Sequence, residues 1–364
     1  MFKILVINPG STSTKFAVFE DDKQISAYTI RHTAEETAKY QKTIDQLAYR
    51  YKLITDLLEK EKINITEFSA IIGRGGMLTP VQSGVYFVNE AMMDVLRKAV
   101  VGDHASNLGA FLAYELAHNP EKCMAYIADP VAVDEFSEVA RISGLPEIPR
   151  RSTFHALNHK AIARLHAEKM GKRYEELNIV VAHLGGGITV GAHQNGRVTD
   201  VNQGLDGYGP FSPERSGTLD AGQIVKMCFS GRYSETEMLK KLNGKGGLIA
   251  HCKTNNVQEL EEKIKQGDGH AKLILEAMAY TVSKEIMSLF AVFKGKNDGV
   301  LLTGGIAYCD FVVNEIKARI EPLAPVYVYP GEDELRSLAL SALRALNGEE
   351  VKEFVVREMP DYTI

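Results

Sequence analysis

Four loops rich in glycine or hydroxyl side chains follow short apolar runs of the chain, and each could bind an anion. They span residues 8–13, 73–76, 183–187 and 303–305. Small residues let backbone N–H groups approach an anion closely, and in open α/β sheets ligands lie beyond the carboxyl ends of the strands. Each loop by itself is more typical of a plain turn, but the four together favour a polyphosphate ligand.

Two arginines lie among small residues, where a long side chain can point into a cleft. Arg74 lies between glycines, and Arg215 lies in the segment 211–217, which contains serine, proline and glycine. The planar guanidinium can bind a carboxylate or a phosphate through two parallel hydrogen bonds. A single loop arginine is more often a solvated surface residue, so these two become candidates through the loops around them.

Two histidines and one aspartate occupy similar places. His183 ends a predicted buried strand just before a glycine loop, and His104 lies at a predicted helix start. Each histidine could be either a structural residue or a catalytic hydrogen-bond donor. Asp129 ends another predicted strand and is better placed than Asp134 to bind a hydrated magnesium ion.

Another pair of histidines, His155 and His159, has the i, i+4 spacing that places both side chains on one face of a helix. Such a pair could bind a metal ion. Because no third ligand follows nearby, we expect instead a structural role between domains.

The elements that must position these residues follow from the apolar pattern. Strands are predicted at 3–7, 15–20, 24–30, 70–72, 124–128, 299–303 and 326–329, and buried or amphipathic helices at 271–293 and 334–346. The order strand, small-residue loop, strand, turn, strand at the N-terminus returns within 178–201, where Asn195 and Gly196 predict a hairpin. Any mixed protein contains two hairpins, but the loop has the same place in both, which favours two related domains.

Composition and missing motifs exclude several classes. The chain of 364 residues carries 42 Lys and Arg against 47 Asp and Glu, a net charge of −5, so we expect no nucleic-acid partner. It contains neither a P-loop nor a G-x-G-x-x-G opening a helix after a strand. We expect no membrane span and no signal peptide. Four cysteines without C-x-x-C spacing fit the reducing cytoplasm.

Several long motifs, in order, resemble those of the acetate kinase family. They lie at 8–15 (Asn-Pro-Gly-Ser-Thr-Ser-Thr-Lys), 73–76, 102–110, 182–187, 209–217 and 302–307. The resemblance extends from Phe2 to about Gly348, and the proline and the Thr-Ser-Thr run of the first motif are similar to the butyrate kinases of that family.

The resemblance implies an α/β fold of duplicated actin-like (ribonuclease H-like) domains with ATP in the cleft between them. We expect an N-terminal domain on the acyl and phosphate side, formed by residues 1–150 and 331–364, with the C-terminal helix packing back on it. Residues 151–330 would form the nucleotide-binding domain. At least a dimer is expected, also by resemblance.

By the same resemblance, the candidate residues acquire roles. The transferring phosphate would lie near Asn8, Ser11, Ser13 and Lys15, and the nucleotide would contact His183, Gly185, Gly186, Gly187, Gly304, Gly305 and Ile306. Arg74 and Arg215 would hold the carboxylate and the phosphoryl group, with His104 and His183 as donors. Asn8 and Asp129 would lie close to Mg²⁺. A family glutamate that helps to hold magnesium falls here at Tyr308, so either Glu332 or Glu334 replaces it, or Asp129 and water suffice.

The implied activity is reversible transfer of a phosphoryl group from ATP to butyrate or a related short-chain fatty acid. The product would be an acyl phosphate, from which the reverse reaction makes ATP during fermentation. The alternatives are a kinase for isobutyrate, propionate or acetate, a sugar kinase with Asp129 as base, and an actin-like ATP-binding protein without such activity.

Overall fold

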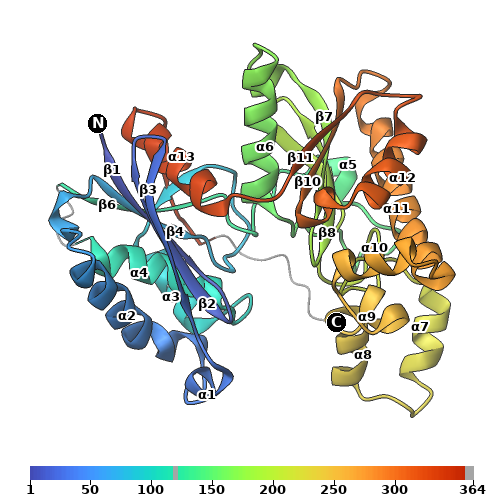
Figure 1. The fold of residues 1–364 in the computed structure, drawn as a ribbon, viewed down its shortest axis with the longest axis horizontal. Helices are drawn as coiled ribbons and strands as arrows, with labels where there is room; N and C mark the ends of the chain where they lie inside the picture. Colours follow the sequence, from blue (N-terminus) through green and yellow to red (C-terminus); the bar gives the residue numbers. More distant parts are fainter. Residues whose placement is uncertain (118–121, 357–364) are drawn as a thin grey trace. The chain divides into compact units, whose positions relative to one another are not determined.

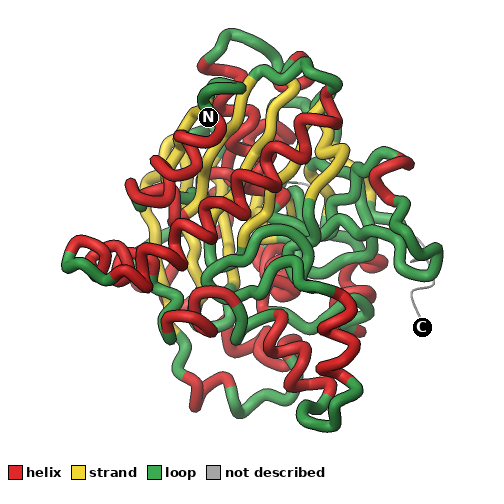
Figure 2. Tube along the Cα trace, turned by 90° about the vertical axis from the view of Figure 1, so that its right-hand side faces the viewer, coloured by secondary structure: helices red, strands yellow, loops and turns green. Residues whose placement is uncertain are grey.

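The computed structural model describes residues 1–117 and 122–356, which form two units (Figure 1). The first unit consists of residues 1–134 together with the chain from Asp333 onward, and the second consists of Glu135–Glu332. Each unit contains one sheet with helices packed on it (Figure 2).

The first unit has a seven-stranded sheet in the order β12-β5-β6-β4-β1-β2-β3. Its strands are β1 (Lys3–Pro9), β2 (Ser13–Glu20), β3 (Lys23–Arg31), β4 (Ala70–Arg74), β5 (Val85–Phe87), β6 (Met124–Ala128) and β12 (Val351–Glu353). Its helices are α1 (Ala34–Thr37), α2 (Leu47–Lys60), α3 (Glu90–Lys98), α4 (Leu108–Leu116) and α13 (Glu334–Leu346), with short 3₁₀ turns η1 (Thr43–Gln46), η2 (Ile65–Glu67) and η3 (Ala105–Asn107).

The second unit has a five-stranded sheet in the order β11-β10-β7-β8-β9. Its strands are β7 (Asn178–Leu184), β8 (Ile188–Gln194), β9 (Arg197–Val201), β10 (Gly299–Gly304) and β11 (Val326–Pro330). Its helices are α5 (Glu138–Arg141), α6 (Ala156–Lys169), α7 (Ala221–Cys228), α8 (Glu235–Leu242), α9 (Gly247–Cys252), α10 (Val257–Lys265), α11 (Gly269–Leu289) and α12 (Asp310–Ile320), with 3₁₀ turns η4 (Tyr174–Glu176), η5 (Phe290–Phe293) and η6 (Gly305–Tyr308).

The predicted repeat is present in the topology. In the first unit β1 pairs antiparallel with β2 and parallel with β4, and β4 pairs parallel with β6. In the second unit β7 pairs antiparallel with β8 and parallel with β10, which pairs parallel with β11. The predicted mixed α/β fold with two related sheets is therefore confirmed.

Both faces of the central strands are buried, as their continuous apolar runs predict. Leu5 and Ile7 of β1 pack in one core with Ile54 of α2 and Leu108 of α4. The opposite face of the sheet meets α13, which contacts β1, β4 and β6. In the second unit α11 and α12 cover one face and α6 the other. Within residues 1–117 and 122–356, no helix combines the length and apolar character needed to cross a membrane.

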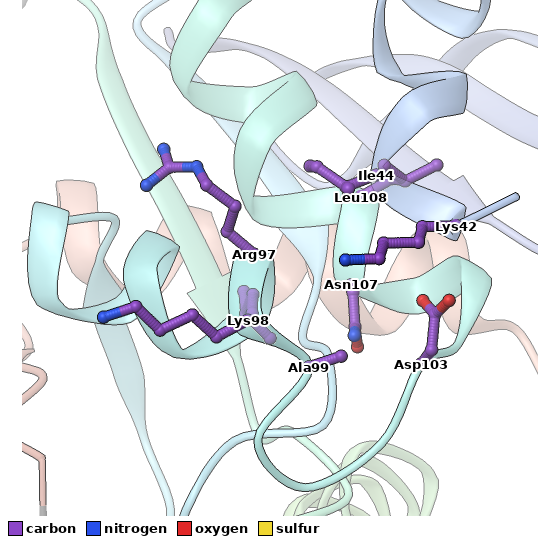
Figure 3. A pocket seen from close by; sticks show the side chains of 9 residues that line it. Lys42, Ile44, Arg97, Lys98, Ala99, Asp103, Asn107 and Leu108 are labelled. Carbon is purple, nitrogen blue, oxygen red and sulfur yellow. The ribbon is translucent and has the colours of Figure 1, made fainter.

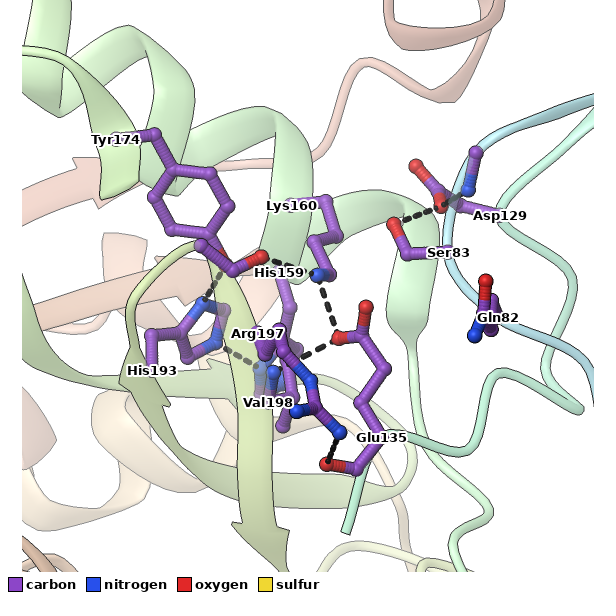
Figure 4. Close-up of polar contacts among 12 residues, drawn as sticks. Gln82, Ser83, Asp129, Glu135, His159, Lys160, Tyr174, His193, Arg197 and Val198 are labelled. Atoms are coloured by element: carbon purple, nitrogen blue, oxygen red, sulfur yellow. Dashed lines mark hydrogen bonds and ion pairs between the residues drawn. The ribbon is translucent and has the colours of Figure 1, made fainter. Parts of the chain in front are cut away.

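The division of the chain differs from the predicted boundaries at residues 150 and 330. Residues 135–150 lie in the second unit, to which backbone and side-chain hydrogen bonds attach them, including one from Ser137 N to Thr199 O of β9 at 3.0 Å. Glu135 accepts hydrogen bonds from Lys160 Nζ (2.6 Å) and Val198 N (2.8 Å), as Figure 4 shows. At the far end of the segment, Arg150 pairs with Asp200 at 2.7 Å. Gly331 and Glu332 also belong to the second unit, and residues 357–364 lie outside the described residues.

The buried pair of Lys160 and Glu135 yields a stability prediction. The Lys160 side chain is 1% exposed and that of Glu135 is 9% exposed, so Lys160→Met leaves an unpaired carboxylate inside the protein. We expect the free energy of unfolding of the second unit, measured in urea, to fall by about 3–5 kcal/mol. Adding Glu135→Gln should restore part of the loss. Lys172→Met, which removes an exposed partner of Asp298, serves as the control and should cost at most about 1 kcal/mol. A similarly small loss for Lys160→Met would contradict the prediction.

Candidate active site

Three candidate residues of the first unit lie at the carboxyl ends of neighbouring parallel strands. Asn8 follows the pair Ile7–Gly73 near the end of β1, and Arg74 ends β4 opposite Ala128. Asp129 comes directly after Ala128 at the end of β6. The sheet therefore places an amide, a guanidinium and a carboxylate along one edge, where ligands of open α/β sheets bind.

Glu334, the first residue of α13, connects two of these groups. Its Oε2 accepts hydrogen bonds from Asn8 Nδ2 at 2.5 Å and from Arg74 Nη1 at 3.1 Å. Arg74 Nη1 also lies 3.4 Å from Asn8 Oδ1. A carboxylate in the first turn of a helix is favourable because the helix N-terminus carries partial positive charge. In the sequence, Glu334 was only one of two possible substitutes for the family glutamate that is replaced by Tyr308. In the structure, its carboxylate instead accepts a hydrogen bond from Arg74.

Asp129 is held in an unusual conformation. It is 3% exposed, and its φ of +37° lies in the left-handed region that few residues other than glycine adopt. Its Oδ1 accepts hydrogen bonds from Ser83 Oγ at 2.6 Å and from Gly84 N at 2.9 Å (Figure 4). Strained backbone of this kind is concentrated at functional sites.

The residues present fit a magnesium ion that keeps most of its water. Asn8 and Asp129 supply oxygen atoms, the ligands that Mg²⁺ prefers. Among the described residues, no group of three or more His, Cys, Asp or Glu side chains is arranged to hold a metal. An ion bound here would therefore complete its coordination with water and with phosphate oxygens of the substrate.

His104 presents a defined hydrogen-bond donor. Its Nδ1 accepts a hydrogen bond from the backbone N–H of Ser106 at 3.1 Å, at the start of η3. Because that N–H can only donate, the neutral ring carries its proton on Nε2. Although the residue is exposed, desolvation by surrounding protein and then the charge of Arg74 lower the pKa of His104, while Asp103 opposes them. A neutral imidazole with an Nε2–H suits contact with a developing anion.

The loop after β1, predicted to lie near the transferring phosphate, is held by hydrogen bonds from a buried arginine. Asn8 pairs in register with Lys15 of β2, and Ser11 and Ser13 lie in or beside the loop between them. Arg50 of α2 is 1% exposed and donates from Nη1 to Gly10 O at 2.8 Å and to Thr14 Oγ1 at 3.0 Å. Sequence reasoning missed Arg50. Arg50 precedes the buried Ile54 and Leu58 at intervals of four residues, which places it on the apolar face of α2. This spacing could have indicated from the sequence that Arg50 is buried.

In the second unit the glycine loop after β7 touches Arg215. A Cβ on Gly187 would fall 1.8 Å from Arg215 Nη1, so only glycine allows the guanidinium this position. Arg215 Nη1 donates to Gly204 O, and Ser212 Oγ donates to Gly186 O at 2.7 Å. Desolvation lowers the pKa of Arg215, opposed by the charge of Glu214. The loop and the arginine thus form one local structure.

The ends of β10 and β11 bring the predicted adenosine-side residues next to this loop. Gly304 has φ +92°, and a Cβ there would lie 2.4 Å from Leu184 O, whereas a Cβ on Gly305 would meet nothing within 4 Å. Ile306 is 6% exposed in η6. Tyr308, at the position of the missing family glutamate, is 65% exposed.

His183 is surrounded by three other polar groups of the second unit. Its Nε2 lies 3.3 Å from Glu332 Oε2, and Asn158 Nδ2 also contacts Glu332 at 3.3 Å. The ring of His155 stacks on His183 with centroids 4.2 Å apart. His155 is not inside a helix as its spacing predicted, since α6 begins at Ala156 and His155 precedes it. Its place beside His183 makes it a candidate site residue, whereas the sequence favoured a structural role.

A cavity of about 160 Å³ lies in the first unit beside η3, to which its lining residue Asn107 belongs. Its lining includes Lys42, Arg97, Lys98, Asp103 and Asn107. Figure 3 shows the Lys98 side chain pointing away from Lys42 and Asp103, so these cations do not converge on one point. None of the predicted site residues lines this cavity.

Comparison with known proteins supports the fold and the class. Residues 147–326 match the Acetokinase family. A propionate kinase from Francisella tularensis superposes with a TM-score of 0.77 at 19% identity, covering 94% of this chain and 99% of that one. An acetate kinase from Porphyromonas gingivalis superposes with a TM-score of 0.77 at 18% identity, covering 95% of this chain and 100% of that one. An acetate kinase from Entamoeba histolytica superposes with a TM-score of 0.73 at 17% identity, covering 92% of this chain and 97% of that one.

These matches establish the fold of the chain and connect its second unit with one family. The chain has the fold of acetate and propionate kinases, and the Acetokinase match in its second unit points to a phosphotransferase of the carboxylate kinase class. The predicted resemblance to the acetate kinase family is confirmed at this level.

The pKa of His104 provides a test of the geometry of the first unit. Because the Arg74 charge disfavours the imidazolium, Arg74→Met should raise the pKa of His104 toward the usual 6.5. An NMR titration of protein labelled at histidine Cε1 measures both values. Arg336→Met removes an exposed arginine paired with Asp22 and should leave the His104 titration unchanged. A wild-type pKa at or above 6.5, or no response to Arg74→Met, would show that the arginine does not act on this ring.

Proposed function

We propose that this protein transfers the γ-phosphoryl group of ATP reversibly to a short-chain fatty acid, with butyrate as the preferred acid. The observation that carries the proposal is the alignment of Asn8, Arg74 and Asp129 at neighbouring strand ends, with Arg74 oriented by Glu334. The Acetokinase match and the fold support the same class. The likeness of residues 8–15 to butyrate kinases supports the choice of acid.

The residue set suits a carboxylate acceptor. A carboxylate is ionised at pH 7 and needs no general base. One of its oxygens attacks the γ-phosphorus, the bond to the β-phosphate oxygen breaks, and that oxygen keeps the electron pair as ADP leaves. No proton is transferred in this step. The protein must instead offset repulsion between two anions and stabilise charge on the group in transfer.

Each candidate has a role in this scheme. Arg74 and Arg215 hold the carboxylate and the moving phosphoryl group, and His104 and His183 donate hydrogen bonds to it. Ser11, Ser13 and Lys15 contact the phosphates on one side, and Gly185, Gly186 and Gly187 on the other, with Gly304, Gly305 and Ile306 beside the adenosine. Asn8 and Asp129 would hold Mg²⁺, with Glu332 as a further candidate, and the bound ion would neutralise phosphate charge.

The preferred acid is tested by trapping the acyl phosphate with hydroxylamine in the presence of ATP and magnesium. Butyrate offers two more methylenes than acetate for burial, each contributing about 0.8 kcal/mol, so its kcat/KM should exceed that of acetate by about 15-fold. A series of linear and branched acids from C2 to C6 measures this. A higher rate with propionate, acetate or isobutyrate would correct the acid but keep the class. Without hydroxamate from any of these acids, the proposed activity is wrong.

The two arginines are tested by substitution. Arg74→Ala and Arg215→Ala should each lower turnover by at least about 100-fold, because each removes a cation that stabilises transition-state charge. Arg336→Ala and Arg173→Ala remove exposed arginines that pair with Asp22 and Glu176 in the respective units, and both should keep near-normal rates. Circular dichroism checks that the variants fold. Near-normal turnover in a folded Arg74→Ala or Arg215→Ala variant would remove that arginine from the site.

A further inference from the structure

Strand β12, at one edge of the first unit's sheet, carries a lysine that reaches the turn before β5. The three residues of β12 pair in register with β5. Just beyond the strand, Phe354 is 2% exposed, and its carbonyl oxygen accepts a hydrogen bond from Asn89 Nδ2 at 2.9 Å. The half-buried Lys352 lies between the pairing and this anchor, so its backbone is fixed on both sides.

Lys352 binds one side of the peptide group between Ser83 and Gly84. Its Nζ donates a hydrogen bond to Ser83 O at 2.7 Å. The end of its side chain also lies against Gly84, where an added Cβ would fall 3.2 Å from Lys352 Cε. Gly84 has a φ of +144°, which residues with a side chain rarely adopt, so the turn depends on glycine here. The ammonium group is therefore packed directly against this peptide group.

Asp129 binds the other side of the same peptide group. Gly84 N donates to Asp129 Oδ1 at 2.9 Å, and Ser83 Oγ donates to the same oxygen at 2.6 Å (Figure 4). The backbone N–H of Asp129 donates in return to Gly84 O at 3.1 Å. In a trans peptide group the C=O and the N–H point in opposite directions, so Lys352 and Asp129 lie on opposite sides of it. The strand order β12-β5-β6 produces this arrangement, because Asp129 directly follows β6.

The two hydrogen bonds through this peptide group strengthen one another. A positive charge at the carbonyl oxygen draws electron density away from the amide nitrogen, so its N–H becomes a stronger donor. A carboxylate that accepts from that N–H makes the carbonyl oxygen a better acceptor for the same reason. The Lys352 ammonium and the Asp129 carboxylate are therefore coupled through one peptide unit.

We propose that Lys352 is a positioning residue for Asp129 and acts through the peptide group of Ser83 and Gly84. By holding that peptide group, it keeps the two donors to Oδ1 in place and so fixes the orientation of the carboxylate at the edge of the sheet. A fixed carboxylate suits a hydrated magnesium ion, because the partners of a metal ligand hold it in the orientation that the ion requires. This purpose rests on the proposed function. The coupling itself rests only on the hydrogen bonds.

One NMR signal reports on both ends of this coupling. Cell-free synthesis with serine labelled at the carbonyl carbon and glycine labelled with nitrogen-15 gives a protein in which only Ser-Gly peptide groups carry both labels. The sequence contains four such steps, at 83–84, 143–144, 216–217 and 230–231. Ser83→Ala removes the first signal and so assigns it, and the other three signals serve as internal references.

The expected results concern the amide proton of Gly84. In the wild type it should exchange with deuterium more slowly than the amide protons of the exposed Gly144 and Gly231. Lys352→Met keeps the length of the side chain but removes the ammonium, so the Gly84 proton should move upfield and exchange roughly 5-fold faster. Lys352→Arg retains a cationic donor and should return both values toward the wild type. Lys60→Met, which removes an exposed lysine of α2, is the matched control and should change neither value.

The magnesium dependence of the reaction tests the purpose of the coupling. Lys352→Met should raise the magnesium concentration that gives half of the maximal rate by about 10-fold, with little change in the KM for the acid. Lys352→Arg should restore most of the wild-type magnesium dependence, which a general loss of structure would not allow. If the wild type forms no acyl phosphate, the proposed function fails, while the Gly84 signal still decides whether Lys352 and Asp129 are coupled.

Two results would overturn the coupling. One is a wild-type Gly84 amide that exchanges as fast as those of Gly144 and Gly231, which does not depend on the folding of any Lys352 variant. The other is a Gly84 signal that is the same in Lys352→Met as in the wild type. An active Lys352→Met enzyme with an unchanged magnesium dependence would overturn the assigned purpose, even where the Gly84 signal moves.

Discussion

One carboxylate oxygen of Glu334, shared by Asn8 and Arg74, connects the two ends of the chain at the candidate site. The contact depends on α13, whose buried Leu338, Ala339 and Ala342 cover the face of the sheet opposite α2 and α4. The packing of α13 on the sheet therefore also brings Glu334 into contact with Arg74. Because Arg74 and Glu334 are only partly exposed, the pair is screened less by water than a surface ion pair.

Most strands and helices could be predicted from the sequence, because the spacing of apolar residues indicates which side of an element is buried. The strand 124–128 and the helix 334–346 have the bounds that the sequence predicts. The hairpin at Asn195 and Gly196 forms with positive φ at both residues, as its composition requires. Repetition of one pattern at 3–30 and 178–201 was enough to infer the duplicated sheet, since each half must bury the same kind of central strand.

The side-chain contacts were not predictable in the same way. The boundary between the units follows the buried pair of Glu135 and Lys160, and nothing in the spacing of these two residues indicates that they meet. The candidate positions at strand ends could be identified from the sequence, but their partners could not. Glu334 lies far along the chain from Asn8, and Lys352 also lies far from Ser83. Local patterns contain no information on such contacts, which arise only when the sheet assembles.

The two sheets share one topology but carry different residues at equivalent strand ends. The ends of β1, β4 and β6 carry Asn8, Arg74 and Asp129, and the corresponding ends of β7, β10 and β11 carry His183, Gly304 and Gly331. In the proposed reaction, the first set would supply a cation and oxygen atoms near the group in transfer. In the second set, Gly304 and Gly331 exchange backbone hydrogen bonds at 3.0 and 2.9 Å, and their missing Cβ atoms allow the chain to approach closely. The two copies of the topology therefore differ in the chemical groups that they place at equivalent strand ends.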